Sequence, residues 1–393
     1  MDPVVVVGGG PVGMLNALGL ARAGIPVTVV EREPDVPAAP RAMVYLFVVL
    51  DGLEQLGILE DVERAGVVVS DGLNVHDFAG GEVIRWPMEV LEGHVAHPYN
   101  VHLGQDRLAR IALDHLDRLP DTRVLWSTAL TRLRDEGDVA VLEVEGPDGA
   151  QEIRASWVIG ADGARSTVRR LMGLEFEGTT WPERFVATNI RYPFDEHGFG
   201  GANMVVDPAL GAIVARIDET GLWRCTYCET ADLPEETIPE RMPDFFRAFL
   251  PDDRQPEVVA WSPYRMHQRA AESMRGGRVL LAGDAAHATN PTGGLGLTSG
   301  MFDTFVLVEA LAAVVHGEAG EQVLDRYAEA RRRTFLEVAS PAATGFKHLV
   351  YHSHDREALE GQLAGMRALA GDPDALRANY LGMRDLATPS LLD

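Results

Sequence analysis

Cysteine is scarce in this 393-residue chain, and the shortage excludes several kinds of site. Two cysteines, Cys225 and Cys228, cannot form a disulfide framework, which suits a reducing, cytoplasmic environment. Their C-x-x-C spacing lies in the β-like stretch Leu222–Tyr227 and not at a helix N-terminus, which favours ordinary strand residues over a redox pair. No spacing of Cys and His completes a metal site, so we expect no metal. Three clustered histidines lack carboxylate support in the sequence and are interpreted as loop residues: His94, His97 and His102.

Lysine and basic charge are also in short supply. Lys347 is the only lysine, so we do not expect a mechanism that needs a Schiff-base lysine. The 35 basic residues are outnumbered by 59 acidic ones, and the net charge of −24 argues against nucleic acid or a membrane surface as partner. No run approaches the roughly 20 apolar residues that cross a bilayer. The apolar start Val4–Val7 has no basic flank, so we interpret it as a strand and not a signal peptide.

What the chain does contain is glycine at the ends of apolar strands. With 46% hydrophobic and 24% charged residues, it has the composition of a globular protein of about two domains. The first glycine cluster follows Val4–Val7, and a helix over Met14–Ala23, a strand over Val27–Val30 and a terminal Glu31 complete a βαβ unit. This pattern is typical of dinucleotide binding, with a structural glycine turn as the alternative. Its turn runs from Gly8 to Gly13 with the G-x-G-x-x-G spacing and includes the expected ligand contacts Gly8, Gly10, Pro11, Val12 and Gly13.

Two further strands end in a glycine and a carboxylate. The strand over Trp157–Gly160 runs into Asp162-Gly163 and then a helix. The strand over Val279–Ala282 runs into Gly283-Asp284, and a loop rich in Pro and Gly leads to another helix. Such corners direct a carboxylate and backbone N–H groups to one side of a sheet, at the carboxyl ends of its strands.

Between these motifs the pattern alternates as in antiparallel strands, which predicts a second sheet. Its strands are expected over Phe185–Tyr192, Ala202–Val206, Ile213–Ile217, Trp223–Cys228 and Ser262–Arg269, with shorter ones over Val67–Val69, Leu73–His76 and Val83–Trp86. Val124–Trp126 and Val139–Val144 are assigned to a small meander. Helices are expected over Gln105–Leu116, Pro234–Leu250, Phe305–Val315, Val323–Val338 and the tail. The run Arg331-Arg332-Arg333 is interpreted as a solvated helix face.

The three glycine motifs, in this order and spacing, resemble those of the FAD-dependent aromatic hydroxylases, the single-component flavoprotein monooxygenases typified by para-hydroxybenzoate hydroxylase and phenol hydroxylase. The resemblance implies an α/β + β fold: a discontinuous Rossmann-like FAD-binding domain, an inserted, mainly antiparallel β-sheet domain for the substrate, and C-terminal helices. We assign residues 1–70, 101–175 and 270–335 to the FAD-binding domain. Residues 71–100 and 176–269 are assigned to the substrate domain, and 336–393 to the C-terminal helical segment.

The resemblance also implies a role for particular residues. Glu31 would bind the adenosine ribose, Asp284 the ribitol, and the N–H groups of Gly296 and Leu297 the pyrimidine edge of the flavin. The full set of expected FAD contacts is Gly8, Gly10, Pro11, Val12, Gly13, Glu31, Arg32, Arg41, Gln105, Asp162, Gly163, Gly283, Asp284, Pro291, Gly294, Gly296 and Leu297. The catalytic candidates are Pro291, beside the flavin ring, and four groups that could assist deprotonation of a phenol: His267, Tyr192, Tyr227 and Arg216. Leu46 and Phe47 are more apolar than the family pattern.

The implied activity is that of an oxidoreductase with FAD as cofactor and NADPH or NADH as transient co-substrate. O2 would form a flavin C4a-hydroperoxide, which hydroxylates a phenolic or other electron-rich aromatic, such as a polyketide-like or heteroaromatic compound. Two alternatives stay open: a flavin-dependent reductase or dehydrogenase that does not use O2, and a flavin-free binding protein. The oligomeric state is also open, with a homodimer as one candidate.

Overall fold

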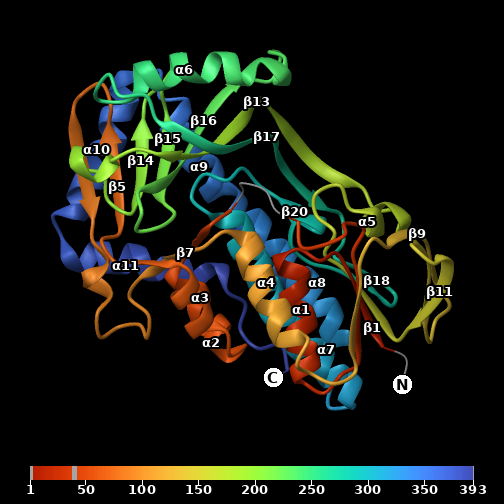
Figure 1. Ribbon diagram of the computed structural model, residues 1–393. Helices are drawn as coiled ribbons and strands as arrows, with labels where there is room; N and C mark the ends of the chain where they lie inside the picture. The colour runs from red at the N-terminus through yellow and green to blue at the C-terminus, as the bar shows by residue number, and fades with distance from the viewer. Residues whose placement is uncertain (1–2, 38–41, 393) are drawn as a thin grey trace.

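The computed structural model describes residues 3–37 and 42–392, and its centre is a parallel sheet built from widely separated segments (Figure 1). Five strands are parallel and one edge strand is antiparallel. The valine-rich strands are buried on both faces, as parallel sheets require. In sheet order the strands are β18 (Arg275–Gly276), β19 (Val279–Leu281), β12 (Trp157–Gly160), β1 (Val4–Val7), β2 (Val27–Val30) and β8 (Thr122–Leu125).

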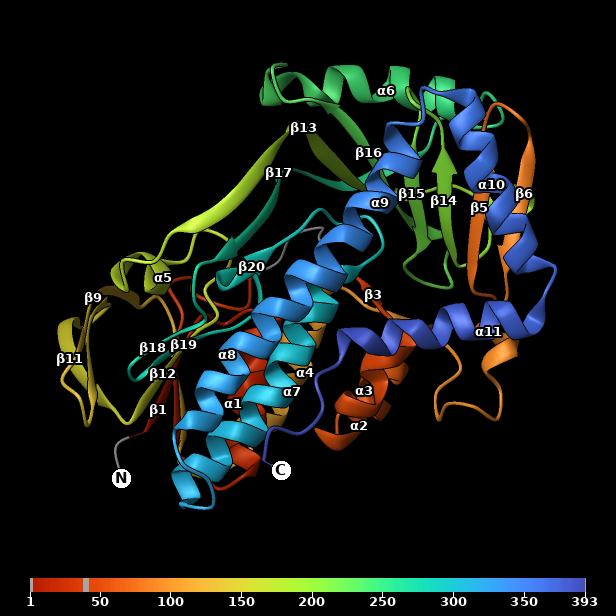
Figure 2. The ribbon, with the colours of Figure 1, turned by 180° about the vertical axis from the view of Figure 1, so that it is seen from behind.

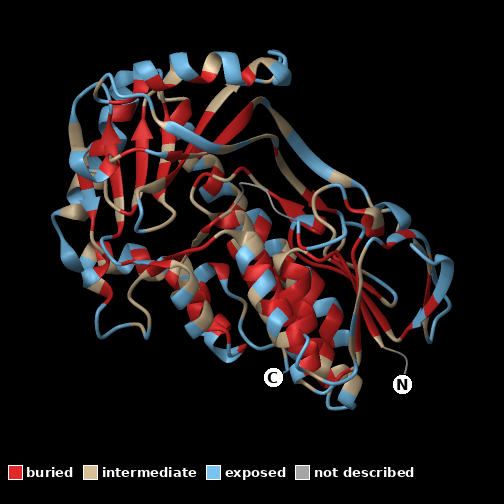
Figure 3. Cartoon of the chain, in the orientation of Figure 1, coloured by how far each residue is buried: buried red, intermediate tan, exposed pale blue. Residues whose placement is uncertain are grey.

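Helices and a small antiparallel sheet complete this core (Figure 3). The helix α1 contacts both α4 and α7, and α7 contacts α8. The antiparallel sheet contains β9, β10 and β11, but β8 pairs with β2 in the parallel sheet, so our assignment of the segment around Val124 to the meander is wrong. Its alternation is too short to reveal its partner. The elements are α1 (Pro11–Arg22), α4 (Gln105–Leu116), α7 (Leu295–His316), α8 (Gln322–Thr334), β9 (Ala129–Asp135), β10 (Ala140–Gly146) and β11 (Gly149–Ala155).

A second, eight-stranded sheet lies above the first, with helices on both faces (Figures 1 and 2). Alternate residues of its strands enter different apolar clusters: Phe185 packs with the C-terminal helices and Val186 packs under α6 (Ile238–Phe249). All its pairings are antiparallel except β14 with β5. In order the strands are β20 (His287–Ala288), β17 (Glu257–Ala271), β13 (Phe176–Arg191), β16 (Leu222–Thr230), β15 (Ala212–Arg216), β14 (Ala202–Val206), β5 (Leu73–Asp77) and β6 (Glu82–Trp86).

Smaller elements connect the two sheets. A three-stranded sheet places β7 between β3 and β4, and short helices flank it and the parallel sheet. These elements are β3 (Val44–Tyr45), β7 (Asn100–His102), β4 (Val67–Val69), α2 (Leu50–Gln55), α3 (Leu59–Ala65) and α5 (Thr167–Leu171).

One helix of the described residues, α7, is long and apolar enough by length and composition to cross a membrane, contrary to our expectation that no segment is. The share of its apolar window that is buried inside the protein is 67%. Its polar residues Ser299 and Asp303 are fully buried as well. Packing in the core therefore accounts for its apolar character.

The part of the chain after α7 is helical, as predicted, but its charges are placed differently. A π-helical turn over Phe335–Ala339 joins α8 to α9 (Ser340–Tyr351), followed by α10 (Arg356–Ala370) and α11 (Pro373–Leu381). Arg331 is 0% exposed, so its assignment to a solvated face is wrong; it pairs with the buried Asp303 of α7. Lys347 is also fully buried, with its Nζ 3.1 Å from Glu183 Oε2 and 4.0 Å from the centre of the Trp181 ring.

Candidate functional site

The three glycine motifs meet at one edge of the parallel sheet. Because β1, β12 and β19 run in the same direction, the residues that follow them lie side by side. The N–H of Ala161 donates to Val7 O at 2.8 Å, and the N–H of Ala282 donates to Gly160 O at 3.0 Å. Val12 of the first motif touches the position where a Cβ on Gly283 would stand, at 3.0 Å. Segments about 270 residues apart in sequence thus form one site.

The first motif leaves space and N–H groups for an anion. Gly8 has φ +115°, and a Cβ there would lie 2.4 Å from Ala161 O, so only glycine fits. A Cβ on Gly13 would lie 2.0 Å from Gly8 O. A Cβ on Gly10, in contrast, would meet no described atom within 4 Å. Gly10 caps α1 without a side-chain cap and Pro11 begins the helix, so no side chain occupies the first N–H groups of α1, which suits a pyrophosphate.

Glu31 stands at the end of β2 beside this turn. Its Oε2 accepts a hydrogen bond from the N–H of Gly9, and its Oε1 accepts from the N–H of Glu33 at 2.9 Å. Arg32 is exposed and pairs with Glu33 at 3.4 Å, so its side chain is directed to solvent. Gln105 begins α4, and its N–H donates to Ala42 O at 3.2 Å. Arg41 lies outside the described residues.

The carboxylate of the second motif binds the start of the helix that follows it, α5. The carboxylate of Asp162 accepts from Ser166 Oγ at 2.5 Å and from the N–H of Thr167 at 2.6 Å. Ser166 in turn caps α5 by accepting from the N–H of Arg169. Gly163 has φ +78° in the turn between them. Asp162 therefore shapes the loop against the first motif, and the loop's backbone is what it presents at the sheet edge.

The third motif forms a rigid corner with an outward carboxylate. Gly283 is buried with φ +60°, whereas Asp284 is exposed at the sheet edge. The N–H of Gly283 donates to Asp303 Oδ2 at 2.9 Å. His287, two residues beyond the η5 turn (Gly283–Ala285), lies with its Nε2 2.7 Å from the same oxygen. The corner is thus fixed from behind while Asp284 faces outward.

The loop after this corner leads into α7. Gly293 and Gly294 have φ values of +89° and +73°, and the N–H of Gly294 donates to Pro291 O at 3.1 Å. Gly294 caps α7 without a side-chain cap, so the N–H groups of Gly296 and Leu297 in the first turn can meet a ligand. The sequence did not predict that Gln268 binds this loop. Its Oε1 accepts from Thr289 Oγ1 at 3.0 Å and from Asn290 Nδ2 at 3.2 Å.

The face of the large sheet that meets the C-terminal helices borders this loop. Phe346 of α9 packs in the same cluster as Phe185, and its ring lies 2.7 Å from where a Cβ on Gly293 would stand. Asn189 is four residues beyond Phe185 on β13 and so points to this face. Arg224 of β16 pairs with Asn189 across the strands and donates from Nε to Asn189 Oδ1 at 2.7 Å.

Arg224 is the functional candidate that sequence reasoning missed. Its side chain is 8% exposed, and burial lowers the pKa of its guanidinium to about 10, while Tyr264 and Asp106 act in the opposite direction. The group therefore keeps its charge at neutral pH. The sequence feature that could have indicated it is a charged residue in the middle of the largely buried strand Leu222–Thr230.

The four side chains proposed to assist deprotonation are dispersed. Tyr192 and Tyr227 lie in the apolar cluster under α6, where burial raises the pKa of Tyr192 to about 12. The guanidinium of Arg216 lies over the Trp223 ring of that cluster at 5.0 Å. On β17, His267 Nδ1 is 2.9 Å from Thr180 Oγ1, and burial together with nearby arginines lowers its pKa. Neighbouring residues of a strand point to opposite faces of the sheet, and the sequence alone did not indicate which face each of these side chains would occupy.

Arginines gather in a cavity of about 370 Å³ beside the second and third motifs. The Cζ of Arg169 lies 3.7 Å from the centre of the Phe176 ring, and its Nη1 donates to Ala285 O at 2.7 Å. Arg269 Nε is buried with no hydrogen-bond partner among the described residues. The lining residues are Arg169, Arg170, Gly173, Leu174, Glu175, Phe176 and Arg269.

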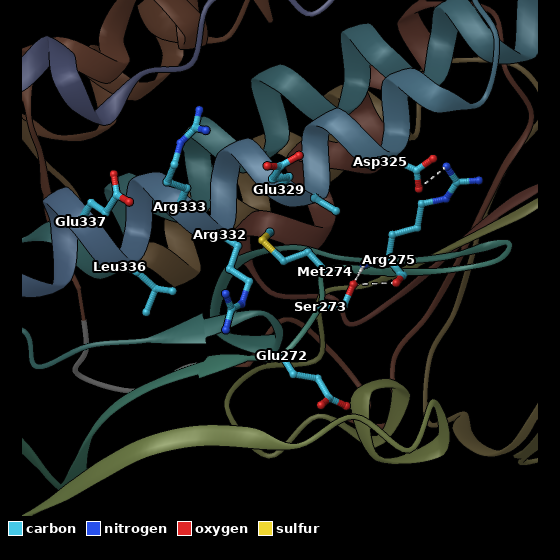
Figure 4. A pocket seen from close by; sticks show the side chains of 11 residues that line it. Glu272, Ser273, Met274, Arg275, Asp325, Glu329, Arg332, Arg333, Leu336 and Glu337 are labelled. Atoms are coloured by element: carbon cyan, nitrogen blue, oxygen red, sulfur yellow. Dashed lines mark hydrogen bonds and ion pairs between the residues drawn. The ribbon is translucent and has the colours of Figure 1, made fainter.

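A groove of about 410 Å³ between α8 and the turn after β17 is different in character (Figure 4). It contains charges of both signs, and Arg275 Nη1 pairs with Asp325 Oδ1 at 2.9 Å. Arg332 donates from Nε to Ala271 O at 2.8 Å. Because these charges pair with groups of the protein itself, we assign the groove no ligand.

The clustered histidines have partners that the sequence did not reveal. His97 Nε2 lies 3.4 Å from Glu54 Oε2 and 3.6 Å from Asp51 Oδ1, which corrects our statement that no carboxylate supports them. Both carboxylates are exposed, and such groups commonly occur without a metal. His102 is buried on β7 with its Nδ1 2.8 Å from Arg216 O, and burial lowers its pKa to about 4.

The chain is similar to known proteins along nearly its whole length. A model of the family described as FAD binding domain matches residues 1–340. The chain is 45% identical over 377 residues to 6-hydroxy-3-succinoylpyridine 3-monooxygenase of Pseudomonas putida, covering 95% of each chain. It is 44% identical over 348 residues to para-nitrophenol 4-monooxygenase of Pseudomonas sp. strain WBC-3, covering 88% of this chain and 86% of the relative. The crystal structure of p-nitrophenol 4-monooxygenase from Pseudomonas putida DLL-E4 matches with a TM-score of 0.95 and 40% identity, covering 99% of both chains.

Proposed function

This chain belongs to the FAD binding domain family and is an FAD-dependent aromatic monooxygenase, and we propose that it acts on a phenol or hydroxypyridine with a substituent para to the hydroxyl. The names of both relatives support the substrate class. Position 4 of para-nitrophenol carries the nitro group, and position 3 of 6-hydroxy-3-succinoylpyridine carries the succinoyl group; each is para to the hydroxyl and is the position named for the monooxygenase. Neither name supports a reductase or a flavin-free binding protein.

The residues at the sheet edge fit FAD. The open N-terminus of α1 suits the pyrophosphate, and Glu31 suits the adenosine ribose. The exposed Asp284 suits the ribitol, and the uncapped N-terminus of α7 suits the pyrimidine edge of the ring. When bound, FAD supplies the redox and oxygen chemistry. We assign FAD to residues 1–70, 101–175 and 270–335, and the substrate to 71–100 and 176–269, which supply most of the eight-stranded sheet.

Arg224 is the observation that carries the substrate proposal. A buried guanidinium whose neighbour Asn189 is uncharged attracts an anion, so it would favour the phenolate form of the substrate. Phenolate oxygen donates electron density to the para carbon, where both relatives are named to act. Phe47 and Phe185 of the same cluster would exclude water from the ring.

The function is tested with the FAD-loaded protein and a matched set of phenols. We expect 4-nitrophenol or 6-hydroxy-3-acylpyridines to accelerate NAD(P)H oxidation and O2 uptake at least about tenfold over the isomers that carry the same substituent meta to the hydroxyl. Chromatography should show loss of the para substituent, as nitrite from 4-nitrophenol, with one oxygen atom taken from O2. Equal rates with both isomer sets, or no O2 uptake with either, would contradict the proposal.

We also propose that the arginine cavity beside the second motif would hold the phosphates of NADPH or NADH, which would supply the hydride when bound. The unpartnered Nε of Arg269 and the guanidinium of Arg170 suit a phosphate, in a chain that is otherwise strongly acidic. The location in the cytoplasm and a homodimeric state stay predictions.

Replacing Arg269 by methionine is expected to raise the KM for the coenzyme about tenfold and to change kcat less than twofold. Loss of a charge-assisted contact to phosphate weakens binding without altering the chemical step. Arg265→Met, at an exposed position of the same strand and outside the cavity, is the control. A KM for NADPH and NADH that is unchanged in Arg269→Met would place the coenzyme elsewhere.

A further inference from the structure

A buried charge cluster lies behind the Gly283-Asp284 corner. Asp303 of α7 is 0% exposed. Its Oδ2 accepts from the N–H of Gly283 and lies 2.7 Å from His287 Nε2, so one oxygen contacts the backbone at the start of the η5 turn and a side chain just beyond the turn. Its Oδ1 accepts from Arg331 Nε at 2.8 Å. The position of the corner therefore depends on where this carboxylate is held.

Asp303 stays ionised because of its neighbours. Burial alone raises the pKa of the carboxyl, but His287 and Arg331 outweigh burial and hold the pKa below its usual value. Removal of one partner from a buried ion pair leaves an uncompensated charge, so the pair is held together strongly once formed. Arg331 is thus the group on which the geometry of Asp303 depends.

Arg331 is itself positioned by the C-terminal end of the chain. Its Nη1 donates to Leu386 O at 2.8 Å and to Thr388 Oγ1 at 3.0 Å, and its Nη2 donates to Ser299 O at 3.2 Å. Leu386 is 3% exposed and belongs to the core that includes α1 and α7. Figure 2 shows the segment after α11 returning towards α7 and α8. Two acceptors of the fully buried guanidinium therefore come from residues 386–388.

We propose that residues 386–388 form a C-terminal strap that positions the flavin corner through Arg331 and Asp303. The inference rests on the proposed placement of the FAD ribitol at Asp284. Without the strap, Arg331 Nη1 loses both of its acceptors, and the guanidinium is no longer held in one orientation against Asp303. Gly283 and His287 then lose a fixed partner, and Asp284 no longer stands in one place. Arg331, Asp303 and the strap are positioning residues, since they act on the ligand only through the corner.

Graded variants of the full protein test the strap. Deletion of residues 386–393 and Asp303→Asn are each expected to raise the dissociation constant for FAD about tenfold, and Thr388→Val about threefold. Deletion of residues 389–393 is the matched control: it removes the contact of Arg326 with Leu391 O but keeps both acceptors of Arg331, so affinity should stay within twofold. FAD affinity is measured by flavin fluorescence, and the ring environment by visible circular dichroism of the bound flavin.

A merely structural strap would lower the melting temperature of the FAD-free protein but leave the affinity and the visible spectrum unchanged, and that result would overturn the proposal. An equal loss of affinity in the two deletions would overturn it as well. Asp284→Ala separates this inference from the proposed function. If Asp284→Ala loses FAD while the strap variants keep it, the strap is rejected alone; if Asp284→Ala keeps FAD, the placement of the ribitol is rejected.

Discussion

Replacing Gly10 by alanine is expected to raise the dissociation constant for FAD about 100-fold and to leave the melting temperature of the FAD-free protein unchanged. Gly10 has φ −74° and ψ 178°, which alanine adopts without strain, and its Cβ would meet no described atom within 4 Å. The added methyl group would stand at the open N-terminus of α1, where the pyrophosphate approaches the backbone. The substitution therefore acts on the ligand and not on the fold.

Gly13→Ala is the matched contrast. Its Cβ would lie 2.0 Å from Gly8 O, so α1 must move away from β1, and the melting temperature of the FAD-free protein should fall as well. Differential scanning fluorimetry with and without FAD separates the two effects. Binding of FAD by Gly10→Ala within threefold of the wild-type affinity would show that the pyrophosphate does not lie at this turn.

Arg224→Met should lower kcat/KM for a phenol by about 100- to 1,000-fold, with FAD affinity unchanged. Methionine fills similar space but cannot stabilise the anionic oxygen, so the substrate would react only when it arrives already ionised. The pH profile of kcat/KM should therefore move to higher pH. The absorbance of bound 4-nitrophenol gives a direct reading, because the phenolate band should weaken in the variant at neutral pH.

Two further variants make the Arg224 result interpretable. Arg224→Lys keeps the charge and should recover part of the activity, which a packing role would not explain. Arg216→Met removes the arginine that the sequence suggested as a catalytic candidate; since its guanidinium lies over Trp223 of the cluster under α6, kcat/KM should change less than threefold. A larger loss in Arg216→Met than in Arg224→Met would reverse the assignment of the substrate face.

Local signals predicted much of the fold. The bounds of β1, β2 and α4 agree with those expected, because apolar runs and glycine turns act over a few neighbouring residues. The three glycine motifs converge because parallel strands present their carboxyl ends at one edge, a rule that needs no detail of packing. The Cys225 and Cys228 thiols are free, as the strand pattern suggested.

The sequence by itself therefore determined the family and the two kinds of sheet, and it predicted the sheet edge at which we propose that FAD binds. Only the tertiary structure decided which charges are buried and on which face of the large sheet each side chain lies. Arg331 looked like a solvated residue because its partner Asp303 is 28 positions away on another helix. Tyr192 and Tyr227 looked catalytic because composition does not say which face of a strand meets α6. Arg224 was recognised as a functional candidate only when the structure showed it buried beside Asn189, since the burial of a charge depends on contacts between distant segments.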